Sequence, residues 1–120
     1  MTGPWAVVAT EELEEWMMSL TDKQQRATRR AINQLEQDGP ALGRPYADTI
    51  RNSRFKNMKE LRISSQGALR VLFAFDPERR AVLLLGGDKS EDSRWNDWYV
   101  GAIQRADDLF EEHLRKIGEK

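Results

Sequence analysis

Residues 59–75 read KELRISSQGALRVLFAF, and their pattern is the strongest indication of secondary structure in the chain. Leu61 and Ile63 alternate with charged residues, a Ser-Gln-Gly turn follows, and apolar alternation resumes at Leu69. A period of two on both sides of a short glycine turn is typical of a β-hairpin. A three-residue turn with Gly67 in the left-handed position keeps the apolar residues on one face. The stretch therefore predicts a hairpin in which Arg62 stands opposite Arg70 on the face away from the core.

Further strands and helices are predicted on either side of this hairpin. Residues 81–85 (AVLLL) are apolar throughout, which indicates a strand buried on both faces inside the sheet. Residues 5–9 (WAVVA) predict a strand that leads into a helix capped by Thr10. Thr21 and Gln24 form a capping-box pattern for a second helix. Together these two helices predict an N-terminal helical hairpin.

The remaining segments complete the expected architecture. Gly39 and Pro40 end the second helix, and residues 39–57 lack periodicity, which predicts a long connection. Residues 92–117 carry an apolar stripe at helical spacing and predict a long C-terminal helix, with Gly101 as a point where it could bend or split. The order of elements predicts a single α+β domain over residues 1–120, with helices on one face of a mostly antiparallel sheet.

The composition excludes several classes of protein. The chain has 120 residues and no cysteine, which excludes disulfides, thiolate nucleophiles and cysteine-based metal sites. Its single histidine, His113, lies on or beside the apolar stripe of the last helix and is expected to be a packed or boundary residue, so no Ser-His-Asp set is expected. No apolar run is long enough to span a membrane, so we expect a cytoplasmic protein without a membrane partner.

The distribution of charge is more informative than the formal net charge of −1. Residues 44–70 carry a net charge of +5, whereas residues 1–43 and 91–120 each carry −3. Such a basic segment attracts phosphate, and arginine can bind it with two parallel hydrogen bonds. The basic residues of this segment are Arg44, Arg51, Arg54, Lys56, Lys59, Arg62 and Arg70.

Two like charges opposite each other in a hairpin are unfavourable without a partner. Glu60 lies on the same predicted face and could bridge Arg62 and Arg70 as a structural network, or a bound phosphate could offset their repulsion. Both alternatives are open at this point. Gly86-Gly87-Asp88-Lys89 reads as a turn that places Lys89 near the two arginines.

No cofactor or metal is expected. Asp88, Glu91, Asp92 and Asp97 lack the spacing of a calcium loop and read as a solvated helix start.

The chain resembles the HigB/RelE toxins of bacterial type II toxin-antitoxin systems, especially their phage-derived HigB-like branch. The resemblance runs over nearly the whole chain and rests on an ordered series of short motifs: Arg44-Pro45, NMKELR (57–62), RVLFAFDP (70–77), VLLLGGDK (82–89), Trp98-Tyr99 and Ala106-Asp107. It implies a RelE-like α+β fold that cleaves mRNA, typically on the translating ribosome, and a cognate helix-turn-helix antitoxin. Glu60, Arg62, Arg70 and Lys89 match the family pattern, and Lys56 and Lys59 occupy its basic approach.

The leading hypothesis is a metal-independent endoribonuclease in which the RNA 2′-OH attacks the adjacent phosphate. Arg62 and Arg70 would hold that phosphate, and Lys89 or Lys59 would move protons, with Tyr99 as a second choice. Arg51, Arg54, Lys56 and Glu60 are expected to contact the RNA. The alternatives are a ParE-like poison of DNA gyrase and a non-catalytic homologue that only binds an antitoxin, so enzymatic activity is an open question.

Overall fold

The predicted hairpin lies at the centre of a five-stranded sheet in the computed structural model, which describes residues 4–89 and 95–118. The elements follow the chain in this order: β1 (Ala6–Ala9), α1 (Glu11–Met18), α2 (Asp22–Asp38), a 3-10 turn (Gly39–Ala41), β2 (Ala47–Thr49), β3 (Met58–Ile63), β4 (Leu69–Phe75), β5 (Arg80–Asp88) and α3 (Trp95–Lys116). The strand order is β1-β5-β4-β3-β2, and the β1–β5 pair is parallel while the other pairs are antiparallel. The prediction of a mostly antiparallel α+β fold is confirmed.

The register of the hairpin agrees with the prediction. Arg62 pairs with Arg70, and the apolar pairs Leu61–Val71 and Ile63–Leu69 flank them. Gly67 has a φ of 102°, in the left-handed region that glycine adopts without strain. The turn chemistry and the alternation of the strands therefore determine this register locally.

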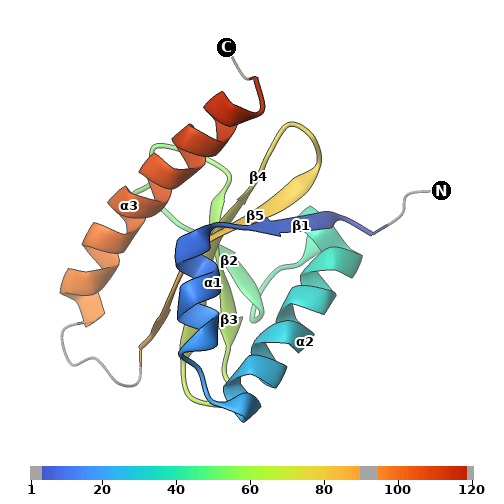
Figure 1. Ribbon diagram of the computed structural model, residues 1–120, viewed down its shortest axis with the longest axis vertical. Helices are drawn as coiled ribbons and strands as arrows, with labels where there is room; N and C mark the ends of the chain where they lie inside the picture. The colour runs from blue at the N-terminus through green and yellow to red at the C-terminus, as the bar shows by residue number, and fades with distance from the viewer. Residues whose placement is uncertain (1–3, 90–94, 119–120) are drawn as a thin grey trace.

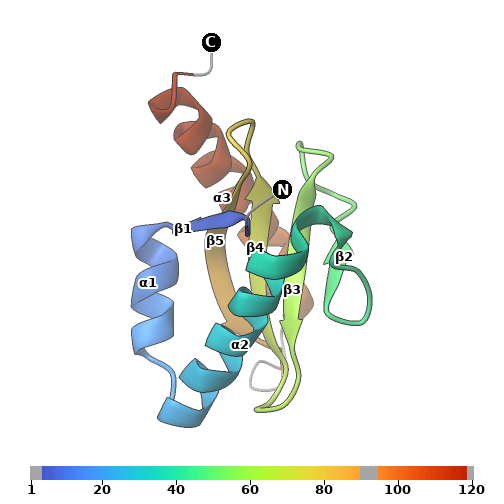
Figure 2. The same ribbon diagram turned by 90° about the vertical axis from the view of Figure 1, so that its right-hand side faces the viewer.

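Helices cover both faces of the sheet, so the prediction that they cover one face is wrong (Figure 2). The helices α1 and α2 pack on the face that carries Leu61, Phe73 and Leu83. The helix α3 packs on the opposite face, against Leu72, Leu84 and their neighbours. The physical reason is that β4 and β5 are apolar on both faces and each face has to be removed from water. Arg62 and Arg70 consequently lie on the face that α3 crosses.

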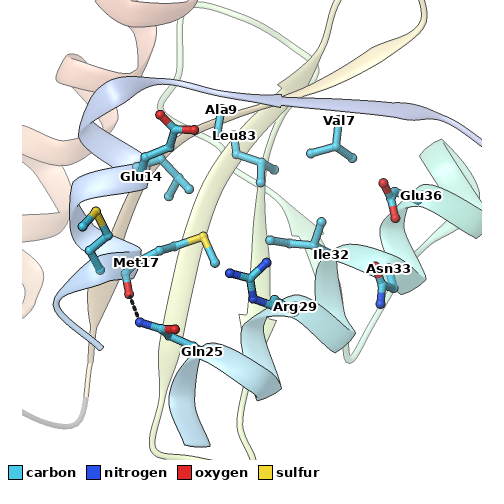
Figure 3. Close-up of a pocket in the computed structure, with 12 residues that line it drawn as sticks. Val7, Ala9, Glu14, Met17, Gln25, Arg29, Ile32, Asn33, Glu36 and Leu83 are labelled. Carbon is cyan, nitrogen blue, oxygen red and sulfur yellow. Dashed lines mark hydrogen bonds between the residues drawn. The ribbon is translucent and has the colours of Figure 1, made fainter. Parts of the chain in front are cut away.

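The N-terminal helices begin where their caps predict. The Thr10 side chain accepts a hydrogen bond from the backbone N–H of Leu13, and Thr21 and Gln24 form the full capping box. From their short connection α1 and α2 diverge (Figure 1). They leave a groove of about 820 Å³ between them, in which Met17 and Ile32 face each other (Figure 3).

Two other details differ from the expectation. The strand β2 lies inside the segment predicted as a connection, because three residues at a sheet edge are recruited by pairing with β3 and show no periodicity of their own. The helix α3 continues through Gly101 without a break. Glu91 and Asp92, where a solvated helix start was predicted, lie outside the described residues.

Gly86 and Gly87 belong to β5 and do not form a turn, so that prediction is wrong. A Cβ atom on Gly86 would lie 2.3 Å from the Trp16 ring, and one on Gly87 would lie 2.6 Å from the Trp98 ring. Trp16 belongs to α1 and Trp98 to α3, so each glycine accommodates a tryptophan from the helix that covers its face. The two glycines are thus packing residues.

We expect Gly86→Ala to lower the free energy of unfolding by about 1–3 kcal/mol, because overpacking against a ring forces neighbours to move. Urea unfolding followed by circular dichroism measures this. Gly43→Ala is the matched control, since a Cβ there meets nothing within 4 Å. Equal stability of Gly86→Ala and Gly43→Ala would contradict this account of the glycine.

Candidate functional site

A cleft of about 540 Å³ opens on the face that α3 crosses, between the N-terminal half of α3 and strands β3 and β4. The end of β2 and the loop after it form a further wall. Four of its five charged lining residues are cations, and Glu60 is the acid. The lining residues are Thr49, Ile50, Arg51, Asn52, Glu60, Arg62, Arg70, Lys89, Tyr99 and Ile103.

The structure brings together five of the eight residues predicted for the site: Arg51, Glu60, Arg62, Arg70 and Lys89. Lys89 follows β5 directly, and its backbone N–H donates to the carbonyl oxygen of Ala68 at 2.9 Å, which brings it beside the hairpin. The basic segment therefore converges with the end of β5.

The other three predicted residues lie elsewhere. Arg54 donates hydrogen bonds to Asp108 and Glu111 on the surface of α3. Lys59 has the strand parity of Leu61, whose side chain lies in the opposite core, so its side chain points away from the cleft. Lys56 does not line the cleft. The alternation of β3 alone separates Lys59 from Arg62.

Glu60 is the centre of the polar network and is only 8% exposed. Its Oε1 accepts a hydrogen bond from the Tyr99 hydroxyl at 2.6 Å, and its Oε2 accepts one from Arg62 Nε at 2.8 Å. Arg62 also contacts Asp48 Oδ2, 3.3 Å from its Nη2. The sequence left two alternatives open, a Glu60 bridge between both arginines and a bound phosphate. Among the described residues Glu60 contacts Arg62 but forms no such bridge to Arg70.

Arg70 differs from Arg62 in its partners. Its Nη1 donates to the carbonyl oxygen of Leu69 at 3.0 Å, and within residues 4–89 and 95–118 no salt bridge to it is found. The described carboxylates likewise make no salt bridge with Lys89. A guanidinium and an ammonium with no carboxylate partner among the described residues retain donors for an anionic ligand. Arg70 and Lys89 are thus better placed to bind phosphate than Arg62.

The protonation states within the network follow from these contacts. Burial and the hydrogen bond to Glu60 raise the pKa of Tyr99 well above its usual value, against the opposing effect of Arg62 and Arg70. Tyr99 therefore stays a hydroxyl donor at neutral pH. The hydrogen bond to Glu60 also raises the pKa of Arg62, although burial opposes it. Tyr99 and Arg62 together hold the Glu60 carboxylate in one orientation.

Asp107 on α3 anchors the loop that forms the wall of the cleft. It is 2% exposed, and its Oδ1 accepts from the Ser53 hydroxyl at 2.5 Å while its Oδ2 accepts from the Arg54 backbone N–H at 2.9 Å. Arg51 and Asn52 directly precede this anchor. Sequence reasoning missed the roles of Asp107 and Asp48. An acid beside the apolar stripe of α3 was the available signal for Asp107.

The described residues provide neither a metal cluster nor a membrane-spanning helix. Among residues 4–89 and 95–118, no cluster of three or more histidine or acidic side chains is arranged to hold a metal ion. None of the helices in the same part of the chain is long and apolar enough to cross a membrane.

The fold is an α+β fold of the RelE type, as two superpositions show. The structure superposes on isolated Escherichia coli RelE toxin with a TM-score of 0.60, covering 82% of this chain and 98% of RelE, at 9% sequence identity. It also superposes on a chain of the toxin-antitoxin complex RelBE2 of Mycobacterium tuberculosis with a TM-score of 0.56, covering 72% of this chain and 99% of that one, at 18% identity. At these identities the comparison shows the fold.

The sequence comparisons show the family. The family model described as Phage derived protein Gp49-like (DUF891) matches residues 15–111. Two proteins of Mycobacterium tuberculosis, named as toxins HigB2 and HigB3, are 48% and 44% identical over 109 residues and cover 89% and 91% of this chain. The matched region is 53% of HigB2, so the chain spans about half the length of that relative, and it is 93% of HigB3. The chain belongs to the Gp49-like family of HigB toxins.

Proposed function

We propose that this chain is the toxin of a type II toxin-antitoxin system and an endoribonuclease that cleaves mRNA on the translating ribosome. The observation that carries the proposal is a single cleft that is lined by Arg62, Arg70, Lys89 and Glu60. A phosphodiester fits such a group of donors, and donors arranged in advance stabilise the charge that develops during its cleavage. Membership of the HigB family supports the same function.

In the reaction we propose, the RNA 2′-oxygen attacks the adjacent phosphorus and the bond to the 5′-oxygen breaks. The products are a 2′,3′-cyclic phosphate and a 5′-hydroxyl. Glu60 lines the cleft, and each of its carboxylate oxygens has a second lone pair besides the one that accepts from Tyr99 or Arg62. One of these remaining lone pairs accepts the 2′-OH proton. Lys89 donates a proton to the departing 5′-oxygen. Arg70, assisted by Arg62, binds the phosphate oxygens, and no step calls for a metal ion.

The proposed partner is a cognate antitoxin that blocks the toxin until it is removed. One of the superposed chains comes from a toxin-antitoxin complex, which supports a protein partner of this kind for the present chain. We propose a helix-turn-helix antitoxin, as the resemblance to the HigB branch implies.

Induced expression in bacteria tests the function. We expect the wild type to arrest growth and translation and to produce cleaved mRNA, and the double variant Arg62→Ala, Arg70→Ala to do neither, because the phosphate site is lost. Primer extension on cellular mRNA locates the cuts, and circular dichroism of the purified variant confirms that it folds. Co-expression of the antitoxin encoded beside the toxin gene is expected to restore growth.

Other outcomes would select another function. If both proteins arrest growth equally, the site is wrongly assigned. Double-strand DNA breaks with intact mRNA would indicate a gyrase poison. A tight antitoxin complex with no arrest by the free chain and no RNA cleavage, with or without ribosomes, would indicate a non-catalytic homologue.

A further inference from the structure

Tyr46 is an exposed aromatic residue that directly precedes β2. It is 59% exposed, and the other large apolar side chains with comparable exposure among the described residues, Met18 and Val100, belong to α1 and α3. A single exposed aromatic residue on a surface does not by itself indicate a binding site. The position of Tyr46 relative to the sheet is what indicates one.

The register places the Tyr46 side chain on the face of the cleft. Ala47 pairs with Leu61, and both side chains are buried in the core under α1 and α2. The backbone N–H of Arg62 donates to the carbonyl oxygen of Tyr46 at 2.8 Å, so Tyr46 is the residue opposite Arg62. Successive side chains of a strand alternate between faces, and opposite residues of an antiparallel pair share a face. Tyr46 therefore extends on the same side as Arg62.

Arg44, two residues before Tyr46, and Arg62, opposite it, favour a nucleic acid strand as the ligand. Asp48 Oδ2 lies 3.1 Å from Arg44 Nε and 3.3 Å from Arg62 Nη2, so these two arginines meet at one carboxylate on the Tyr46 face. The Arg44 side chain is 75% exposed and can reach the backbone of a bound strand. Proteins that bind single-stranded nucleic acid combine positive charge along the backbone with exposed aromatic rings on which the bases stack.

We propose that Tyr46 stacks against a nucleobase of the RNA next to the phosphate held by Arg70 and Lys89. The inference rests on the proposed function and adds a base-binding subsite to it. Tyr46 directly precedes the edge strand β2, and β3 lies between β2 and the strand β4 that carries Arg70. Stacking is tolerant of base identity but stronger for purines, so the subsite also gives the toxin a preference for a purine at one position.

Binding of uncleavable RNA tests the subsite without requiring catalysis. The probes are 2′-O-methyl oligoadenylate, oligouridylate and an oligonucleotide of equal length without bases, each measured by fluorescence anisotropy. We expect Tyr46→Ala to bind oligoadenylate roughly 5- to 150-fold more weakly than the wild type. Tyr46→Phe is expected to retain the affinity, and Tyr46→Leu to lose it, because leucine offers apolar area without an aromatic face. Affinity for the probe without bases is expected to stay unchanged in every Tyr46 variant.

Matched variants separate failure of this inference from failure of the proposed function. Met18→Ala removes an exposed apolar side chain on the remote helix α1 and is expected to bind like the wild type. Arg70→Ala is expected to weaken binding of all three probes. If Tyr46→Ala binds oligoadenylate like the wild type while Arg70→Ala does not, the subsite is refuted and the phosphate site stands. If the wild type binds none of the probes and cleaves no RNA, both proposals fall.

Discussion

Replacing Asp76 by alanine is expected to lower the free energy of unfolding by about 3–5 kcal/mol, because it removes one partner of a buried charged network. The Asp76 side chain has no exposed surface. Its Oδ1 accepts from the backbone N–H groups of Glu78 and Arg80 at 2.9 and 3.0 Å. Its Oδ2 accepts from Arg80 Nε at 2.9 Å and lies 2.8 Å from His113 Nε2. One carboxylate thus joins the β4–β5 turn to the C-terminal half of α3.

The same contacts predict how the stability depends on pH. Burial opposes ionisation of Asp76, but the hydrogen bonds from His113 and Arg80 outweigh it and hold the pKa of Asp76 below its ordinary value of 3.8. A lowered pKa in the folded state stabilises the protein above the unfolded pKa, and this contribution disappears as the pH falls through the folded value. We therefore expect the stability difference between the wild type and Asp76→Asn to be constant above about pH 5 and to shrink below pH 4.

Urea unfolding at pH 7 and at a series of acidic pH values measures both effects. Asp108→Ala is the matched control, because Asp108 is 60% exposed in its side chain and makes a surface salt bridge with Arg54. Its loss is expected to cost about 0–1 kcal/mol. An Asp76→Ala protein as stable as Asp108→Ala would show that the buried network contributes nothing.

Arg70→Ala is expected to slow RNA cleavage by about 10²–10³-fold while leaving stability nearly unchanged, because Arg70 is proposed to stabilise the reacting phosphate. Its side chain bonds to the carbonyl oxygen of Leu69, and in the described part of the chain it forms no salt bridge whose loss would unfold the protein. Arg70→Lys keeps the charge but loses the paired donors, so we expect an intermediate rate. Single-turnover cleavage of a defined RNA measures the rate, and urea unfolding measures the stability.

Arg62→Ala provides the contrast within the same hairpin. Its guanidinium binds the nearly buried Glu60 carboxylate and Asp48, so its removal is expected to cost about 1–3 kcal/mol of stability as well as activity. Equal losses of stability in Arg62→Ala and Arg70→Ala would contradict the division of roles between the two arginines. Cleavage by Arg70→Ala at the wild-type rate would remove Arg70 from the proposed mechanism.

Local chemistry made much of this fold predictable. The Gly67 turn and the alternation around it determine which residues of β3 and β4 stand opposite each other. The caps at Thr10 and Thr21 determine where α1 and α2 begin. Each of these features depends on residues within a few positions of one another. The local conformation that these residues favour can therefore be predicted without knowing the rest of the structure.

The candidate site was predictable only in part. The net charge of residues 44–70 and the alternation of side chains along the strands predicted that Glu60, Arg62 and Arg70 share one face. The position of Lys89 after the predicted strand over residues 81–85 placed it near them. Tyr99, Asp48 and Asp107 act through contacts across 39, 14 and 53 or 54 residues of chain. The hydrogen bonds of Tyr99 and Asp107 form because α3 packs across the sheet, and that of Asp48 forms because β2 pairs with β3 at the sheet edge.

The sequence by itself determined the hairpin, its paired arginines and the basic segment, since period, turn and charge are local properties of the chain. The tertiary structure decided that α3 covers the arginine face, that Glu60 binds Arg62 and Tyr99, and that Gly86 and Gly87 receive tryptophan rings. The reason is physical: a sheet that is apolar on both faces must be covered twice, and only packing determines which helix lies over which strand.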